Sequence, residues 1–132
     1  MGNYEFIKYR RKYKQKVIKL VEECFSNISA SKVNSNTYIA VCNNEVVGNI
    51  SYQIIEDSYK GNIAYISYVC TKKEYRNRGI AHKLLEIVEN NLKEKNIHRI
   101  MLTSAYEKKD ANKLYLNCGY LKKESNIFVK DI

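Results

Sequence analysis

The stretch YVCTKKEYRNRGIA, residues 68–81, decides the fold because the period of its apolar residues changes within it. A strand-like run ends in its first part, and a helical pattern starts at Gly79. The first turn of a helix has unpaired backbone N–H groups and a partial positive charge, so it attracts anionic oxygens. Arg76 and Arg78 add charge, and the stretch suits a pyrophosphate. Solvated basic residues before an ordinary helix N-terminus would give the same pattern.

The rest of the chain predicts strands and helices in one domain, 1–132. Alternation and helical spacing of apolar residues locate the elements. Strands are expected at residues 4–9, 37–42, 46–55, 63–71, 98–104 and 127–129, and helices at 11–26, 79–95 and 109–117. A mixed sheet flanked by helices is the economical fold for this order, so the expected fold class is α+β (mixed α/β).

The chain is strongly basic, with 23 Lys and Arg against 14 Asp and Glu and a formal net charge of +9. This excess favours an anionic partner such as a phosphate, an acidic surface or a nucleic acid, although a compositional bias toward Lys, Asn, Ile and Tyr explains it equally well. No apolar run approaches the ~20 residues of a membrane span, and the N-terminus lacks the apolar core of a secretory signal. No membrane partner is therefore expected.

The four cysteines show neither the spacing of a metal site nor that of a redox motif. They are Cys24, Cys42, Cys70 and Cys118. We expect free thiols in a reducing cytoplasm and no bound metal. The nucleotide-binding patterns GxxxxGK[ST] and GxGxxG do not occur either, so ordinary nucleotide loops are unsupported.

Residues 76–81, Arg-Asn-Arg-Gly-Ile-Ala, fit the acyl-coenzyme A loop Arg/Gln-x-x-Gly-x-Gly/Ala of the GNAT superfamily of N-acetyltransferases, which the chain resembles. Residues 69–71 and 97–104 look like that family's fourth and fifth strands, which splay to admit pantetheine. The segment KLYLNCGY, residues 113–120, is similar to the family's Leu-Tyr…Gly-Phe segment. The resemblance covers about residues 37–130. It implies a mixed, mostly antiparallel central sheet of about six or seven strands, flanked by helices, with the fourth and fifth strands splayed.

The resemblance also implies an enzyme that takes acetyl-CoA as cosubstrate and moves its acetyl group to a primary amine by direct attack. The backbone of Val69 and Thr71 would pair with pantetheine, and the amides of residues 77–82 would hold the pyrophosphate. Tyr115 would donate a proton to the departing thiolate, unless it is only a packed helix aromatic. The implied cofactor-binding set is Val69, Cys70, Thr71, Arg76, Asn77, Arg78, Gly79, Ile80, Ala81 and His82.

Two positions depart from the family pattern. Lys108 stands where several members carry an Asn seven residues before the Tyr, and Thr103 stands where some use a Glu as general base. The base is therefore not identified; the loop carboxylates Glu56, Asp57 and Glu107 and a water chain remain candidates. Cys70 lacks an apparent His partner, so a ping-pong reaction is not expected.

The acceptor amine also stays open. Residues 17–36 and 54–62 would form its side of the site, and a small-molecule amine is favoured over a protein amine. A basic first helix would suit an acidic or phosphorylated amine. A noncatalytic acyl-CoA sensor is an alternative, and so is a nucleic-acid-binding module built on Lys8, Arg10, Arg11, Lys12, Lys14, Lys16 and Lys19. A homodimer that pairs along residues 127–129 is a further expectation.

Overall fold

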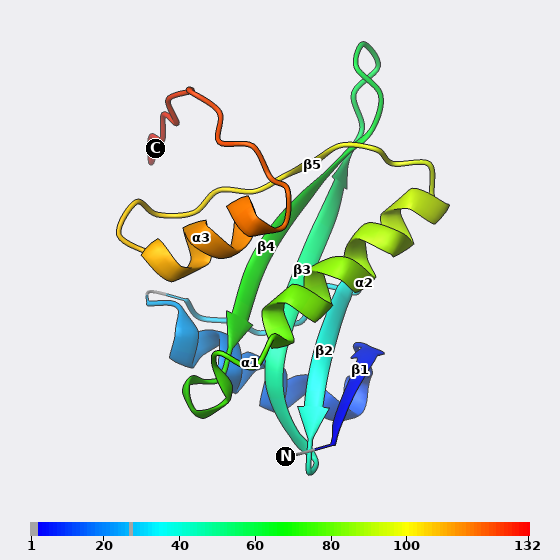
Figure 1. Cartoon of the computed structure of the whole chain (residues 1–132), viewed down its shortest axis with the longest axis vertical. Coiled ribbons are helices and arrows are strands. Elements are labelled where there is room, and N and C mark those ends of the chain that lie inside the picture. The colour runs from blue at the N-terminus through cyan, green and yellow to red at the C-terminus, as the bar shows by residue number, and fades with distance from the viewer. Residues whose placement is uncertain (1–2, 27) are drawn as a thin grey trace.

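The computed structural model describes residues 3–26 and 28–132, and its sheet carries helices on both faces (Figure 1). The strands are β1 (Tyr4–Lys8), β2 (Thr37–Cys42), β3 (Glu45–Ile55), β4 (Ile63–Thr71) and β5 (Ile100–Met101), and the helices are α1 (Lys14–Cys24), α2 (Ile80–Glu94) and α3 (Lys109–Asn117). Short 3-10 turns at Arg11–Tyr13 and Lys73–Tyr75 precede α1 and α2. The predicted α+β class is confirmed. Within the described residues, no helix is long and apolar enough to span a membrane.

The strands lie side by side in chain order, β1-β2-β3-β4-β5. Neighbouring strands are antiparallel except for β4 and β5, which are parallel. The tight turn between β2 and β3 uses Asn43 and Asn44, whose φ angles of 51° and 65° match the primed turns that join twisted hairpin strands. The parallel step from β4 to β5 needs a crossover, and α2 provides it.

Two apolar clusters attach the helices to opposite faces of the sheet. On one face, Leu84 and Val88 of α2 pack with Ile50 of β3. On the other face, Val17 of α1 packs with Ile39 of β2. Because successive residues of a strand point to opposite faces, the buried strands supply apolar side chains to both clusters. Figure 1 shows α2 and α3 in front of the sheet and α1 behind it.

The start of α2 rests directly on β3. Gly48 makes this approach possible, because a Cβ atom there would lie 2.7 Å from Ile80 Cγ2 and 3.2 Å from Leu84 Cδ1. The helix N-terminus that the sequence associates with phosphate binding is thereby held at a fixed position on the sheet.

The sheet has five strands, fewer than the resemblance implied. The strand expected at 127–129 does not form, and the side chains of Ile127, Phe128 and Val129 are 69%, 91% and 82% exposed. Of the strand expected at 98–104, only Ile100–Met101 pairs. Both differences have one physical reason: a strand needs a partner at hydrogen-bonding distance, and these segments run apart from the sheet edge.

Candidate functional site

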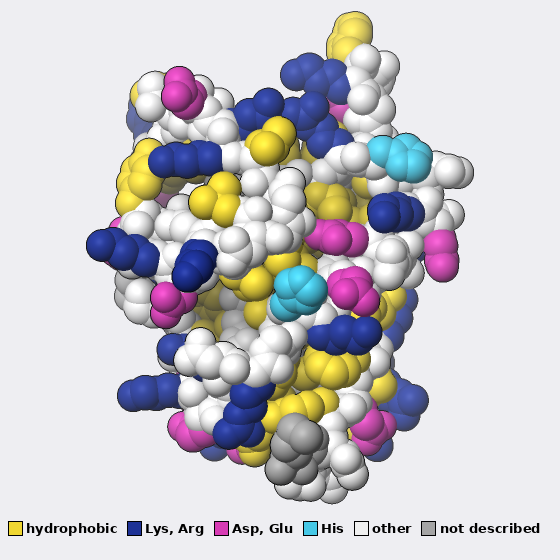
Figure 2. Space-filling view, viewed as in Figure 1, with side chains coloured by type: hydrophobic (Ala, Val, Ile, Leu, Met, Phe, Trp, Pro, Cys, Tyr) yellow, Lys and Arg dark blue, Asp and Glu magenta, His cyan; other side chains and the backbone are white. Residues whose placement is uncertain are grey.

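The candidate site lies where β4 and β5 separate. Ala64 lies opposite Ile100 and Tyr65 opposite Met101, and the pairing then ends. A cavity of about 110 Å³, which we call the interstrand cavity, occupies the gap. It is lined by Phe25, Ile66, Ser67, Tyr68, Val69, Leu102, Thr103, Ser104, Ala105, Lys108, Ala111 and Tyr115. The splay expected between the fourth and fifth strands is therefore present, and Figure 2 shows the front face hollowed between α3 and the loop before α2.

The interstrand cavity connects the two faces of the sheet. Ile66, Leu102 and Tyr115 belong to the apolar cluster on the α2 face, whereas Phe25 packs with the cluster on the α1 face. All four residues line the same cavity. Two molecules can therefore meet in it from opposite sides of the sheet.

A backbone irregularity in β4 borders the cavity. Tyr68 has a φ of 53°, and the pairing of β3 with β4 shifts register between Asn49 and Ser51. The fully buried Asn49 side chain donates from Nδ2 to the Tyr68 carbonyl at 2.9 Å and so holds the irregular segment in place. Such bulges re-aim backbone groups next to binding sites. The sequence analysis did not identify Asn49. The signal that could have revealed it is a polar amide side chain within a run of apolar strand residues.

The loop before α2 offers free backbone donors. Asn77 and Gly79 have φ angles of 64° and 78°, and the first helical hydrogen bond runs from Lys83 N to Gly79 O. The N–H groups of residues 80–82 thus lie in the first turn, where no helical carbonyl is available to them. Gly79 and His82 are exposed, whereas the Ile80 side chain is 2% exposed and points into the core. A ligand can therefore contact only the backbone of Ile80.

The two arginines of this loop are held by other residues. Arg76 Nε donates to Thr71 O at 3.1 Å. Arg78 donates to the Tyr4 hydroxyl at 3.1 Å, and its guanidinium lies over the Tyr75 ring at 5.2 Å. The structure therefore brings Arg76 to the end of β4 and directs Arg78 toward β1.

Tyr115 reaches the cavity from α3. Burial is the largest cause that raises the pKa of its phenol to about 12, with smaller contributions from Cys70 and Cys118. Its ring packs against Tyr120 edge to face, with 6.0 Å between centroids. Tyr120 in turn donates to Glu89 Oε2 at 2.8 Å, which anchors the aromatic pair to α2. Tyr115 therefore stays protonated throughout the neutral range.

Two thiols meet at the end of β4 on the α1 face. A hydrogen bond from Cys70 lowers the pKa of Cys24 to about 7, against the opposing effect of burial, and Arg76 lowers it further. The same hydrogen bond and burial raise the pKa of Cys70 well above its usual value. Cys24 also lies 3.9 Å from Thr71 O. Cys24 is thus the thiol that ionises first, and spacing along the chain gave no sign of this pair.

Lys108 and Phe25 form the α1 side of the interstrand cavity. The Lys108 Nζ atom lies 4.5 Å from the centroid of the Phe25 ring, a cation–π distance. The Phe25 ring in turn meets Tyr68 edge to face, with 5.5 Å between centroids. The sequence singled out Lys108 only as a departure from a family pattern and did not associate it with Phe25.

The carboxylates considered as general base lie elsewhere. Asp57 accepts N–H bonds from Tyr59 at 2.8 Å and Lys60 at 3.0 Å, which lower its pKa. Neither Glu56 nor Glu107 lines the interstrand cavity. Among the described residues, no carboxylate or imidazole lines it, and no group of three His, Cys, Asp or Glu side chains is placed to hold a metal ion.

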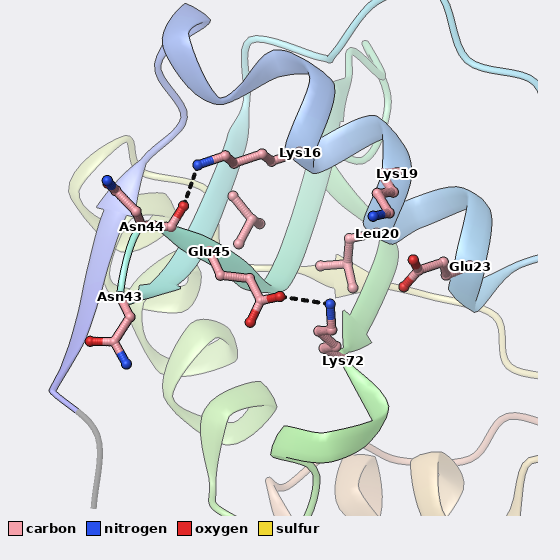
Figure 3. Close-up of a pocket in the computed structure, with 9 residues that line it drawn as sticks. Lys16, Lys19, Leu20, Glu23, Asn43, Asn44, Glu45 and Lys72 are labelled. Carbon is pink, nitrogen blue, oxygen red and sulfur yellow. Dashed lines mark hydrogen bonds and ion pairs between the residues drawn. The ribbon is translucent and has the colours of Figure 1, made fainter.

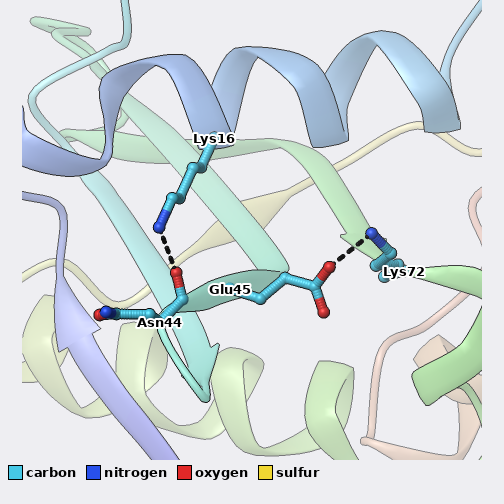
Figure 4. A network of polar contacts seen from close by, with 4 residues as sticks. All are labelled: Lys16, Asn44, Glu45 and Lys72. Atoms are coloured by element: carbon cyan, nitrogen blue, oxygen red, sulfur yellow. Dashed lines mark hydrogen bonds and ion pairs between the residues drawn. The ribbon is translucent and has the colours of Figure 1, made fainter.

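A second, larger cavity of about 320 Å³ lies between α1 and the β2–β3 hairpin (Figure 3). Three of its charged side chains make polar contacts within it (Figure 4): Lys72 pairs with Glu45 at 2.8 Å, and Lys16 donates to the Asn44 carbonyl. The pairing raises the pKa of Lys72 and lowers that of Glu45. Among the described residues, the splay of β4 and β5 lies at the interstrand cavity and not at this one, so the interstrand cavity is the stronger candidate.

Comparisons with known proteins agree with this geometry. A model of the acetyltransferase (GNAT) family matches residues 4–120. An aminoglycoside acetyltransferase, meta-AAC0020, from an uncultured soil metagenomic sample, in complex with trehalose, is similar with a TM-score of 0.80 at 19% identity, over 98% of this chain and 95% of that one. A predicted acetyltransferase with acetyl-CoA from Clostridium acetobutylicum has a TM-score of 0.75 at 20% identity, over 98% and 96%. A chain of the NatC complex bound to Gag peptide and CoA has a TM-score of 0.83 at 22% identity, over 92% and 87%.

Proposed function

The chain belongs to the acetyltransferase (GNAT) family and is an acetyl-CoA-dependent acetyltransferase; from this premise we propose that it acetylates a small-molecule primary amine by direct attack in a ternary complex. The observation that carries the proposal is the interstrand cavity, which is lined by residues from both faces of the sheet. Cofactor and amine can approach each other there from opposite faces. Positioning of this kind supplies much of the rate in reactions between two bound molecules.

The α2 face is the side proposed for acetyl-CoA. Backbone N–H groups of residues 77–82 would hold its pyrophosphate, and the backbone of Val69 and Thr71 would align pantetheine between the strands. The bound cosubstrate supplies an activated acetyl thioester. Thr71 O also accepts a hydrogen bond from Arg76 Nε, which a pantetheine N–H would share or replace.

Tyr115 is proposed to act on the sulfur that leaves. Its pKa of about 12 lies well above that of an ordinary thiol, about 8.5, so complete proton transfer to a thiolate is uphill. A hydrogen bond from the phenol to the developing negative charge needs no such transfer and stabilises the transition state directly. The raised pKa ensures that the donor proton is present.

The proposed deprotonation of the acceptor uses water. No carboxylate or imidazole lines the interstrand cavity among the described residues, whereas Lys108 does. A nearby cation disfavours the ammonium form of a bound amine and so lowers its pKa. The amine can then lose its proton to solvent and attack in the neutral form.

The proposal is tested in two steps. Coenzyme A should raise the melting temperature in proportion to the logarithm of its concentration, as a ligand of the native state does. A panel of primary amines is then screened for release of free coenzyme A thiol from acetyl-CoA. Binding without turnover of any amine would identify a noncatalytic acyl-CoA sensor, and no thermal shift at millimolar coenzyme A would contradict the proposal altogether.

Three further properties complete the proposal. Residues 1–132 act as one catalytic domain, and the enzyme works in the cytoplasm with its cysteines as thiols. It also forms a homodimer, because the apolar side chains near the C-terminus, Ile127, Phe128 and Val129, are exposed in the single chain. Light scattering that shows a monomer across the micromolar range would contradict the dimer.

A further inference from the structure

We propose that the acceptor is an anionic or zwitterionic amine, whose carboxylate pairs with Lys108 at the α1 side of the interstrand cavity, and that polycationic amines are disfavoured. The inference rests on the proposed acetyl transfer and specifies the chemical class of its acceptor.

The direction of approach follows from the positions of the two ends of the cavity. The donor N–H groups at the start of α2 lie on the α2 face, so a phosphate-bearing cosubstrate enters from there. The amine must then arrive from the α1 face. Phe25 and Lys108 meet on that face, with 4.5 Å between the ammonium nitrogen and the ring centroid.

Lys108 gives this side its charge. It is the one charged residue among those lining the interstrand cavity. Within the described residues, ion pairs join Lys72 to Glu45 and Lys83 to Glu86, and none includes Lys108. Its ammonium group therefore has donor capacity left for a ligand, since the contact with Phe25 uses one side of the group only.

The neighbouring charged residues add to the positive charge on this side of the cavity. Arg76 lies at the end of β4, beside Thr71 and Cys24. Of the acidic residues of α1, Glu22 accepts the Ala30 N–H at 3.4 Å, and Glu23 lines the second cavity together with lysines, although its charge also acts on Cys24. A polycation that enters the interstrand cavity would meet like charge at Lys108, and because Lys108 is exposed to solvent this repulsion is moderate.

The same charge suits the chemistry. A zwitterionic acceptor would place its carboxylate on Lys108 and its amine toward the thioester, where the amine loses its proton to solvent before it attacks. Phe25 and Tyr68, packed edge to face, add an apolar wall for the body of the acceptor.

The test compares acceptors that differ only in one charge: L-alanine with L-alaninamide, and L-phenylalanine with L-phenylalaninamide, with spermidine and kanamycin as polycations. Rates are compared at equal concentrations of neutral amine, because a carboxamide alters the pKa of the neighbouring amine. Because Lys108 is exposed, we expect kcat/KM to favour the carboxylates about two- to fivefold over the carboxamides, the size of an ion pair at the surface. A preference for the carboxamides or the polycations would overturn the inference.

Variants of Lys108 assign the preference to this residue. Lys108→Gln should reduce the carboxylate-to-carboxamide ratio about two- to fivefold, and Lys108→Glu should invert it. Lys109→Gln, which removes an adjacent charge that does not line the cavity, is the matched control and should keep the ratio. An unchanged ratio in Lys108→Gln overturns the inference.

A binding measurement separates this inference from the proposed acetyl transfer. In the presence of coenzyme A, the thermal shift caused by each carboxylate is compared with that of its carboxamide. A larger shift with the carboxylate that disappears in Lys108→Gln supports the acceptor site even without turnover. No shift with any member of the pairs, together with no turnover, overturns it.

Discussion

The ammonium nitrogen of Lys108 lies 4.5 Å from the centre of the Phe25 ring, across the gap in which β4 and β5 part. Phe25 is the residue that ends α1, and Lys108 is the residue that precedes α3. The contact therefore joins opposite ends of the chain at one wall of the interstrand cavity. It gives that wall a cation supported by an aromatic face, and among the described lining residues no other side chain is charged.

Gly79→Val tests whether the loop before α2 binds coenzyme A. Gly79 has a φ of 78°, which strains any residue with a β-branched side chain, and a Cβ there would meet nothing within 4 Å. Gly61 has a φ of 81° and equally open surroundings, so Gly61→Val is a control with matched strain. We expect both variants to fold, and only Gly79→Val to lose the thermal shift caused by coenzyme A. Equal shifts in the two variants would contradict a role for this loop.

Tyr115→Phe tests whether the Tyr115 hydroxyl contributes to catalysis. We expect kcat to fall at least about tenfold while the affinity for acetyl-CoA is nearly unchanged, because the hydroxyl acts only as the thioester breaks. With a pKa of about 12, Tyr115 should cause no loss of rate between pH 7 and about 10. The measurement is kcat against pH at saturating acceptor, under conditions where chemistry limits the rate. Full activity of the variant would assign Tyr115 to packing alone, and loss of cofactor binding would assign it a structural role.

Cys24 should react with iodoacetamide at unusually low pH. The thiolate is the reactive form, and the pKa of Cys24 is lowered from 9.0 to about 7. Its alkylation rate should therefore rise through pH 7 and level off at about pH 8, where an ordinary thiol is still mostly protonated. Peptide mass spectrometry after short exposure measures each site.

Two variants test the cause of this reactivity. Cys70→Ala removes the largest cause and should move the midpoint upward, while Arg76→Gln should move it less. Cys118, whose pKa is raised by burial, is the internal control and should react more slowly at pH 7. Equal rates at Cys24 and Cys118 at pH 7 would contradict the assignment.

Gly48→Ala should destabilise the protein by about 1–3 kcal/mol, the usual cost of overpacking a core. The added Cβ would lie 2.7 Å from Ile80 Cγ2, so the start of α2 must move. Urea unfolding measures the loss of stability, and the thermal shift with coenzyme A should shrink because the donor N–H groups move with the helix. Ile80→Leu removes the clashing methyl group, and the double variant should regain part of the lost stability. An undiminished stability in Gly48→Ala would show that α2 adjusts freely.

Local patterns in the sequence predicted most of the fold. The alternation in residues 63–71, the glycine at 79 and the helical spacing that follows located β4, the loop and α2, because each depends on neighbours along the chain. The range 109–117 predicted for a helix is that of α3. The resemblance to the GNAT superfamily, carried by residues 76–81 and 113–120, indicated the residues proposed to bind acetyl-CoA and the Tyr115 side chain, and the structure places Tyr115 in the interstrand cavity.

Only the tertiary structure decided which residues meet across the sheet. The apolar residues 127–129 have strand propensity but form no strand, since pairing depends on a partner distant in the chain. Cys24 lies beside Cys70, and Phe25 beneath Lys108, because α1 packs behind the place where β4 and β5 diverge. No spacing in the sequence encodes these contacts. They arise from the packing of helices on opposite faces, and that packing sets the charge at the proposed acceptor side and lowers the pKa of Cys24.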